Sequence, residues 1–378
     1  MNAISGLNSQ RLLCLVKAAL HDTTPADKLF INTLDADWQT LFEHSALQGV
    51  MVLTFYGAMR LPQALQPPHA LKMRWIASVE SVEKRYGQLL ETANDIADFF
   101  KENHIRMLLF KGLALSKFYP VPGSREFGDL DIFLFGKAKE GNALLNRITG
   151  KSALSAKKHD SHTYRGIVIE NHHSFLNHGL ESILLHSETL EKRLLGILAN
   201  AGISGEPACP AYGQSGANLL FPPPDFDVLF VTLHILANIP VRMVLRYFCD
   251  LTVLFTAYKG IVDFSFYRNT LSEAGLIKPV NAIISLSVRY LGLNPAYAPP
   301  YESDKVLEDR LWNELLNPAV TPPPLEKRNI YTICKHKIRL FRSNRWKYEL
   351  IYPGNFRKRI RYSVLFHCLH PTSIFKIR

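Results

Sequence analysis

Two carboxylates, Asp129 and Asp131, lie in an apolar run downstream of a Lys-Gly pair, within the stretch FKGLALSKFYPVPGSREFGDLDIFLF (110–135). Strand side chains alternate, so both carboxylates point to one face and Leu130 to the other. Like charges this close repel each other unless a cation lies between them. Mg²⁺ takes oxygen ligands, usually one or two carboxylates plus substrate phosphates. The pair therefore predicts a metal site for phosphoryl displacement chemistry.

The Lys111-Gly112 turn is a candidate phosphate contact. A glycine between a strand and a helix lets backbone N–H groups approach a phosphate closely. Lys111 either reaches that phosphate or covers the strand end with its amine in water. Arg125 either pairs with Asp129 or a phosphate, or is a structural arginine of the loop.

A third carboxylate, Glu170, lies in the apolar run GIVIENHHSF. Alternation puts Glu170 and His172 on one face. A Glu buried without a partner costs several kcal/mol, and a metal or a basic group removes that cost. We therefore expect a metal or a basic side chain beside Glu170. The alternative is an edge strand with Glu170 and His172 in solvent. His172 and His173 are candidate substrate contacts.

The elements that must position these residues indicate an α+β fold, in which a small mixed sheet is flanked by helical regions. Apolar residues recur at helical spacing over roughly 71–103, and short apolar runs predict strands at IRMLLFK and DLDIFLF. ALSAKKHD and TYRGIVIENHHSF predict a hairpin with its turn near DSHT. The predicted regions are a helical region at 1–70, a catalytic core at 71–205, a second helical region at 206–334 and a basic tail at 335–378.

The segments LLFKGLALSKFYP and REFGDLDIF resemble the nucleotidyltransferase superfamily with the polymerase-beta-like palm. More narrowly, they resemble an uncharacterised bacterial nucleotidyltransferase family with the pattern LKG…YP…R…DxD, and the similarity extends over roughly 30–260. The resemblance implies that Gly112 is the phosphate-turn glycine and that Asp129 and Asp131 bind metal. It also implies a third carboxylate on a neighbouring strand. Glu170 is the candidate, and as third carboxylate it would complete the metal set and act as general base on an acceptor hydroxyl.

Composition excludes several other classes of protein. The five cysteines are scattered without CxxC spacing, which argues against a disulfide framework or a zinc site of that type. The most apolar late stretch, 227–245, is too polar to span a membrane, since it contains Asp227, His234, Asn238, Pro240 and Arg242. The N-terminal segment has no basic region before its apolar run, so we expect an amphipathic helix, not a signal peptide. The expected location is cytoplasmic, with peripheral membrane association as the alternative.

The basic tail carries the whole net charge of +11. Residues 335–378 hold 12 of the 44 Lys and Arg residues and one of the 33 acidic residues, so the rest of the chain is balanced. The tail interleaves bases with aromatic residues, which suits an anionic membrane surface or a nucleic acid. The alternative is a terminal helix pair packed on the body with a solvated basic side.

The helical stretches after residue 224 contain further polar residues. Arg246 and Asp250 are four apart, which predicts an ion pair along one helix. The alternative is that His234 or Arg246 lines the catalytic cleft.

Together these features predict an enzyme that moves a nucleotidyl group from an NTP to an acceptor, with Mg²⁺ or Mn²⁺ as the cofactor. The sequence leaves the acceptor open among a sugar, a protein, an RNA and a small molecule. Two alternatives remain: a degenerate NTP-binding or scaffold protein, and a nucleic-acid-modifying enzyme that uses its basic tail.

Overall fold

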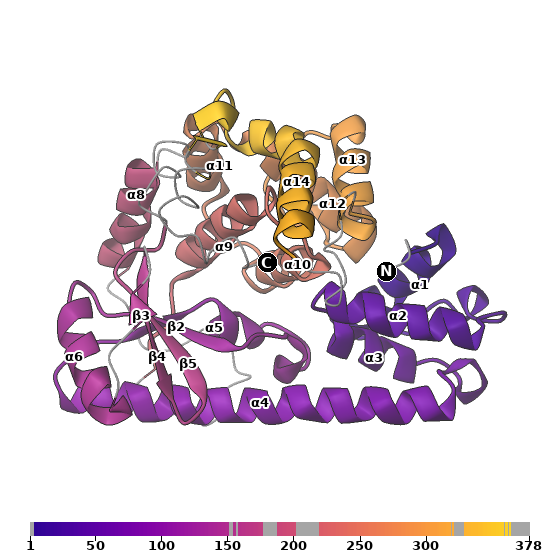
Figure 1. Ribbon diagram of the computed structural model, residues 1–378, viewed down its shortest axis with the longest axis horizontal. Helices are drawn as coiled ribbons and strands as arrows, with labels where there is room; N and C mark the ends of the chain where they lie inside the picture. Colours follow the sequence, from indigo (N-terminus) through magenta and orange to yellow (C-terminus); the bar gives the residue numbers. More distant parts are fainter. Residues whose placement is uncertain are drawn as a thin grey trace.

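The computed structural model is a mixed helix and sheet fold (Figure 1), so the α+β prediction is confirmed. It describes residues 4–150, 154–155, 158–176, 187–201, 219–318, 320, 329–358, 360–361 and 363. The Gly- and Pro-containing segment GEPACPAYGQSG (205–216), whose composition predicts a loop, lies outside these residues.

The N-terminal region consists of helices that pack against one another around buried aromatic residues. Trp38 and Trp75 are almost completely buried, and the rings of Phe42 and Trp75 meet edge to face. The helical stretch that follows Asp37 is interrupted at Gly49, whose positive φ of 65° ends the regular backbone. The helices are α1 (Gly6–Leu20), α2 (Asp35–Leu47), α3 (Met51–Met59) and α4 (His69–Glu102).

Helix α4 has 34 residues and follows a Pro-Pro pair that cannot continue a preceding helix. Its apolar side chains recur three or four residues apart and form one buried stripe. Trp75 and Val79 pack with the N-terminal helices, whereas Leu89 and Ile96 pack beneath the sheet. In Figure 1, α4 runs along the whole base of the molecule, so one helix supports both regions.

The sheet has five strands in the order β1-β2-β5-β4-β3. The neighbours β2 and β5 are parallel, and the other neighbouring pairs are antiparallel. The strands predicted at IRMLLFK and DLDIFLF are confirmed as β1 and β2. The bounds are β1 (Leu108–Phe110), β2 (Asp129–Phe133), β3 (Leu154–Ser155), β4 (His159–Tyr164) and β5 (Ile167–His172).

The predicted position of the hairpin turn was wrong. DSHT lies inside β4, and the turn is at Arg165-Gly166, where both residues have positive φ. Two consecutive residues of positive φ form the tight turn whose twist matches the flanking strands. The turn places His159 of β4 opposite His172 of β5.

The two faces of the sheet are buried in different ways. Leu109, Leu130 and Ile132 pack down on α4 in an apolar cluster. The opposite face carries Phe110, Asp131 and Glu170 and lies below the C-terminal helices (Figure 1). Phe110 contacts Phe230 edge to face there.

The remaining helices before the C-terminal region are α5 (Gly112–Ser116), α6 (Ala138–Thr149) and α8 (Ser187–Asn200).

The C-terminal helices pack as a bundle over the sheet, as the helical pattern from 224 to about 292 predicted. Most side chains of the two central helices are buried. The bounds are α9 (Pro224–Asn238), α10 (Leu245–Ala257), α11 (Phe264–Glu273), α12 (Ile277–Leu291), α13 (Lys305–Leu316) and α14 (Ile330–Ile351). Among the described residues, no helix is both long and apolar enough to cross a membrane.

The described part of the basic tail packs on the body. Tyr348, Ile351 and Tyr352 are buried, and the Asn344 amide donates to the carbonyl of Pro240 at 3.0 Å. Lys347 pairs with a carboxylate of α13. The first part of the tail therefore belongs to a helix that packs on the body and has most of its basic residues on the solvent side. Residues 364–378 are not among the residues that the structure describes.

Close packing of α1 against α3 depends on Gly57. A Cβ at this position would lie 2.1 Å from the Leu15 carbonyl oxygen, which is backbone and cannot move aside. We expect Gly57→Ala to lower the free energy of unfolding by about 1–3 kcal/mol. Gly87→Ala in α4 is the matched control, because nothing lies within 4 Å of its Cβ; it should stabilise the helix by up to about 1 kcal/mol. Urea unfolding measures both, and equal effects would contradict the close-packing argument.

Candidate active site

The register of β2 with β5 brings the predicted carboxylates together. Asp131 pairs with Glu170 across these parallel strands, and Asp129 pairs with Val168. Paired positions point to the same side of a sheet. Asp131 and Glu170 therefore lie side by side, with Asp129 two residues earlier on the same face. The alternation predicted for DLD is confirmed, because Leu130 is buried on the opposite face.

Asp131 is a buried carboxylate with two nitrogen partners. Nζ of Lys111 lies 2.5 Å from Oδ1 of Asp131, and Nε2 of His172 lies 2.9 Å from the same oxygen. Burial alone would raise the pKa of Asp131, but Lys111 and His172 together hold it below its usual value. The same contact raises the pKa of Lys111 against the opposing effect of burial. Lys111 thus places a compensating positive charge against Asp131, and His172 adds a hydrogen bond to the same oxygen.

Lys111 reaches Asp131 from an unusual backbone conformation. Its φ is 58° and its ψ is −129°, a region that residues with a Cβ seldom adopt. The next residue, Gly112, has no room for a side chain, since a Cβ there would lie 2.8 Å from the Phe127 ring. Lys111 was predicted either to reach a phosphate or to hold its amine in water; in the structure its amine contacts Asp131.

Glu170 has two histidine neighbours. Its Oε2 lies 3.4 Å from Nε2 of His172 and 3.2 Å from Nδ1 of His159. Burial would raise the pKa of Glu170, yet the hydrogen bond from His172 lowers it. Glu170 is half-buried and pairs with both neighbouring strands, so the edge-strand alternative with Glu170 in solvent is wrong.

Asp129 differs from its two carboxylate neighbours. Burial and the negative charge of Asp131 raise the pKa of Asp129, and Lys111 opposes this only in part. Of the three carboxylates, Asp129 is therefore the one whose ionised form a nearby cation would stabilise most. Its side chain is half-buried and lies at the start of β2.

His172 is completely buried between the carboxylates and the backbone. Its Nδ1 donates to the carbonyl of Ser174 at 3.1 Å, while its Nε2 faces Asp131 and Glu170. The neighbouring His173 is exposed. His172, which was predicted as a substrate contact, is completely buried and lies against both Asp131 and Glu170.

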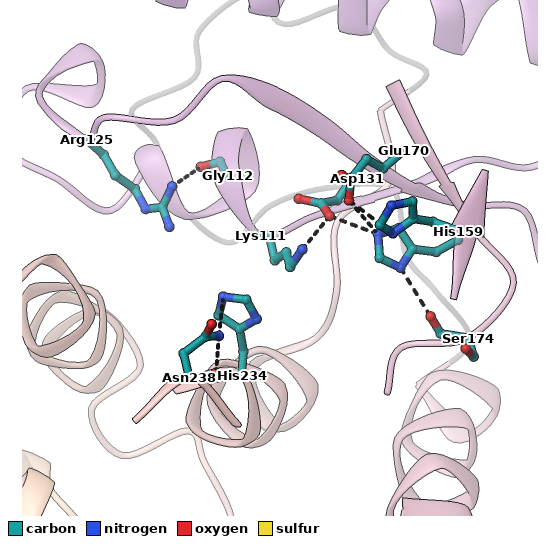
Figure 2. Close-up of polar contacts among 10 residues, drawn as sticks. Lys111, Gly112, Arg125, Asp131, His159, Glu170, Ser174, His234 and Asn238 are labelled. Atoms are coloured by element: carbon teal, nitrogen blue, oxygen red, sulfur yellow. Dashed lines mark hydrogen bonds and ion pairs between the residues drawn. The ribbon is translucent and has the colours of Figure 1, made fainter. Parts of the chain in front are cut away.

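Arg125 forms a buried ion pair with Asp250 of α10. Its Nε and one terminal nitrogen lie 2.7 and 2.9 Å from the two carboxylate oxygens, and Tyr119 donates to the same carboxylate at 2.6 Å. A further Arg125 nitrogen donates to the Gly112 carbonyl at 3.3 Å (Figure 2). The expected pair of Arg246 with Asp250 was wrong, because Asp250 accepts from Arg125 and Tyr119 instead.

The loop between Arg125 and Asp129 is tied to two helical regions. Oε1 of Glu126 accepts from the backbone N–H of Met51 at the start of α3 at 2.6 Å. Arg246 of α10 donates to the Glu126 backbone carbonyl. The loop that leads into the carboxylate strand is thereby fixed from both sides.

Two further histidines lie next to the carboxylate cluster. His234 points from α9 toward Lys111 (Figure 2), and burial together with the Lys111 charge keeps its pKa well below the usual value. His159, on β4, contacts Glu170. Sequence reasoning did not single out His159, because its position opposite His172 follows from the Arg165-Gly166 turn.

The donor set fits a hard divalent cation. Nε2 of His172 contacts oxygens of both Asp131 and Glu170, so these two carboxylates lie within reach of one ion or one pair of ions. Asp129 adds further oxygen donors on the same face. Carboxylate oxygens are the protein ligands that Mg²⁺ uses.

Comparison with known proteins gives one match. A family described as "Uncharacterised nucleotidyltransferase" matches residues 35–292, more than half of the chain. No curated protein and no solved structure matches. The matched range begins with α2 and ends just after α12, so it contains every residue of the site described above.

The Arg125–Asp250 pair should be structurally important. Asp250→Ala would leave a buried guanidinium without its carboxylate, and we expect the free energy of unfolding to fall by about 3–5 kcal/mol. The double variant Arg125→Met/Asp250→Leu removes both charges and should recover most of that loss. Urea unfolding of both variants checks this. A change within about 0.5 kcal/mol for Asp250→Ala, as at an ordinary surface position, would refute the structural role.

The lowered pKa of Asp131 links stability to pH. A carboxylate whose pKa falls on folding stabilises the protein above its unfolded pKa, and that contribution disappears as the pH drops through the folded value. We expect Asp131→Asn to cost about 3 kcal/mol at pH 7 and progressively less below about pH 4. Urea unfolding from pH 7 to 3 measures this. Exposed Glu302→Gln is the charge-matched control, and a pH-independent cost for Asp131→Asn would contradict the pairing.

Proposed function

The chain belongs to the uncharacterised nucleotidyltransferase family, and on this premise we propose that it transfers a nucleotidyl group from an NTP to an acceptor hydroxyl or phosphate. The resemblance read from the Lys-Gly turn and the DLD strand agrees with this family. One observation carries the proposal: Asp131 and Glu170 are directly opposite each other on the parallel strands β2 and β5, and Asp129 lies on the same face.

Asp129, Asp131 and Glu170 would hold Mg²⁺ or Mn²⁺. Such an ion, when bound, neutralises charge on the transferring phosphate and positions the reacting oxygens. The clustering of these carboxylates with Lys111 supports this assignment, because their charges influence one another's pKa.

Residues around the carboxylates would bind and orient the substrates. The Lys111 amine faces Asp131 and contributes positive charge beside the expected phosphate position. The Gly112 turn, braced by Arg125, offers backbone without a side chain. Glu170 is the proposed general base: its Oε2 would accept the acceptor's proton, and the low pKa keeps it ionised for that step.

Label transfer tests the proposal directly. We expect the α-phosphate label of at least one of the four NTPs to be incorporated into an acceptor in cell extract, and a γ-phosphate label not to be incorporated. Chelation of the metal should abolish the incorporation. Asp129→Asn, Asp131→Asn and Glu170→Gln should each lower it at least about 100-fold, because ligand loss removes several kcal/mol of charge stabilisation.

Glu302→Gln serves as the charge control and should transfer label at the wild-type rate, because its carboxylate is exposed and lies outside the strands. Tight binding of Mg²⁺ and NTP without incorporation would instead support the degenerate binding or scaffold alternative. Incorporation from the γ-label alone would indicate phosphoryl transfer and would reject nucleotidyl transfer. Label found on RNA would support the nucleic-acid-modifying alternative.

A further inference from the structure

A cluster of nitrogen and oxygen donors lies beside the aspartates. His159 of β4 and His172 of β5 are directly opposite each other in the sheet register, and Glu170 is two residues before His172. One ligand atom from each of the three side chains lies within 4.8 Å of the others. Figure 2 shows His159 and Glu170 converging beside Asp131.

The spacing of these donors suits a small coordination sphere. Tetrahedral ligands at about 2.0–2.1 Å from a metal lie roughly 3.4 Å from one another. Nδ1 of His159 lies 3.2 Å and Nε2 of His172 lies 3.4 Å from Oε2 of Glu170. The same His172 nitrogen is 2.9 Å from Oδ1 of Asp131, which places a fourth donor next to the cluster.

His172 has the support that metal-binding histidines usually have. Such a histidine donates its second ring nitrogen to a backbone carbonyl or a carboxylate, which fixes the ring orientation. Here Nδ1 of His172 donates to the Ser174 carbonyl, and the ring is completely buried. The Phe110 ring contacts it edge to face and restricts its rotation further.

His159 supplies a second, independent observation. Its Nδ1 is buried and makes no hydrogen bond among the described residues, although it points at Glu170. A buried polar atom without a hydrogen bond costs free energy unless another partner is present. The His159 and Glu170 side chains are 16% and 19% exposed, so an ion can enter from solvent.

We propose that His159, Glu170 and His172 bind a first-row divalent transition-metal ion such as Zn²⁺. Imidazole nitrogen favours ions of this group, whereas Mg²⁺ prefers an all-oxygen set. These three ligands include only Glu170 from the carboxylate set proposed above, and Asp131 lies next to them. The inference rests on donor geometry and not on the transfer reaction.

Metal binding without nucleotide tests the inference. Full-length protein freed of metal by a chelator is titrated with Co²⁺, whose visible absorption reports coordination. We expect one equivalent of Co²⁺ to give the intense bands of a four- or five-coordinate nitrogen and oxygen site. Stoichiometric Zn²⁺ should abolish the bands, and about a 100-fold excess of Mg²⁺ should not, since Mg²⁺ binds imidazole poorly.

The variants separate this site from its surroundings. His159→Ala should weaken Co²⁺ binding by at least about tenfold, the loss expected even for a residue that only supports a ligand. The exposed neighbour His173→Ala is the matched control and should bind as wild type. His159→Gln provides a second variant in case the alanine variant does not fold.

Three results would overturn the proposal: weak six-coordinate Co²⁺ bands in the wild type, displacement of Co²⁺ by Mg²⁺, or wild-type affinity in a folded His159 variant. None depends on label transfer. A chain that binds Co²⁺ as expected but transfers no nucleotide would retain this inference and lose the proposed function. A chain that transfers nucleotide but gives only six-coordinate Co²⁺ bands would retain the proposed function and lose this inference.

Discussion

A carboxylate buried inside a sheet stays ionised when a positive charge and hydrogen-bond donors lie against it, and Asp131 has the Lys111 amine and Nε2 of His172. Much of the local structure follows from this requirement. The Lys111 backbone takes an unfavourable positive φ that brings its amine to Asp131. His172 is oriented by the Ser174 carbonyl so that its other nitrogen faces the same oxygen. The strained turn and the buried histidine are thus two parts of one charge-balancing arrangement.

The strand register places further polar side chains beside Asp131. Parallel pairing of β2 with β5 sets Asp131 beside Glu170, and the Arg165-Gly166 turn sets His159 opposite His172. A shift of one residue in either pairing would turn the affected side chains to the other face, into the apolar cluster on α4. That cluster therefore fixes the register, and the register fixes the polar site.

Much of this fold could be predicted from local patterns. The apolar spacing of α4, the short strands β1 and β2 and the alternation of DLD are properties of a few neighbouring residues. Contacts between distant segments could not be predicted in this way. The partner of Arg125 is 125 residues away, and the i,i+4 rule suggested the wrong partner for Asp250. His159 was missed for the same reason, because a misplaced hairpin turn hides which residues face each other.

The attachment of the loop at Glu126 has a consequence for modularity. This half-buried carboxylate accepts backbone hydrogen bonds from the first turn of α3, and Arg125 next to it pairs with α10. Neither partner belongs to the segment between α4 and β5 that holds the carboxylates. An excised sheet with its supporting helix would keep all three acidic residues, yet it would expose the unpaired charges of Arg125 and Glu126 at its cut surfaces. The carboxylate-bearing face of the sheet is therefore held in place by both helical regions, and the sheet is not a transplantable unit.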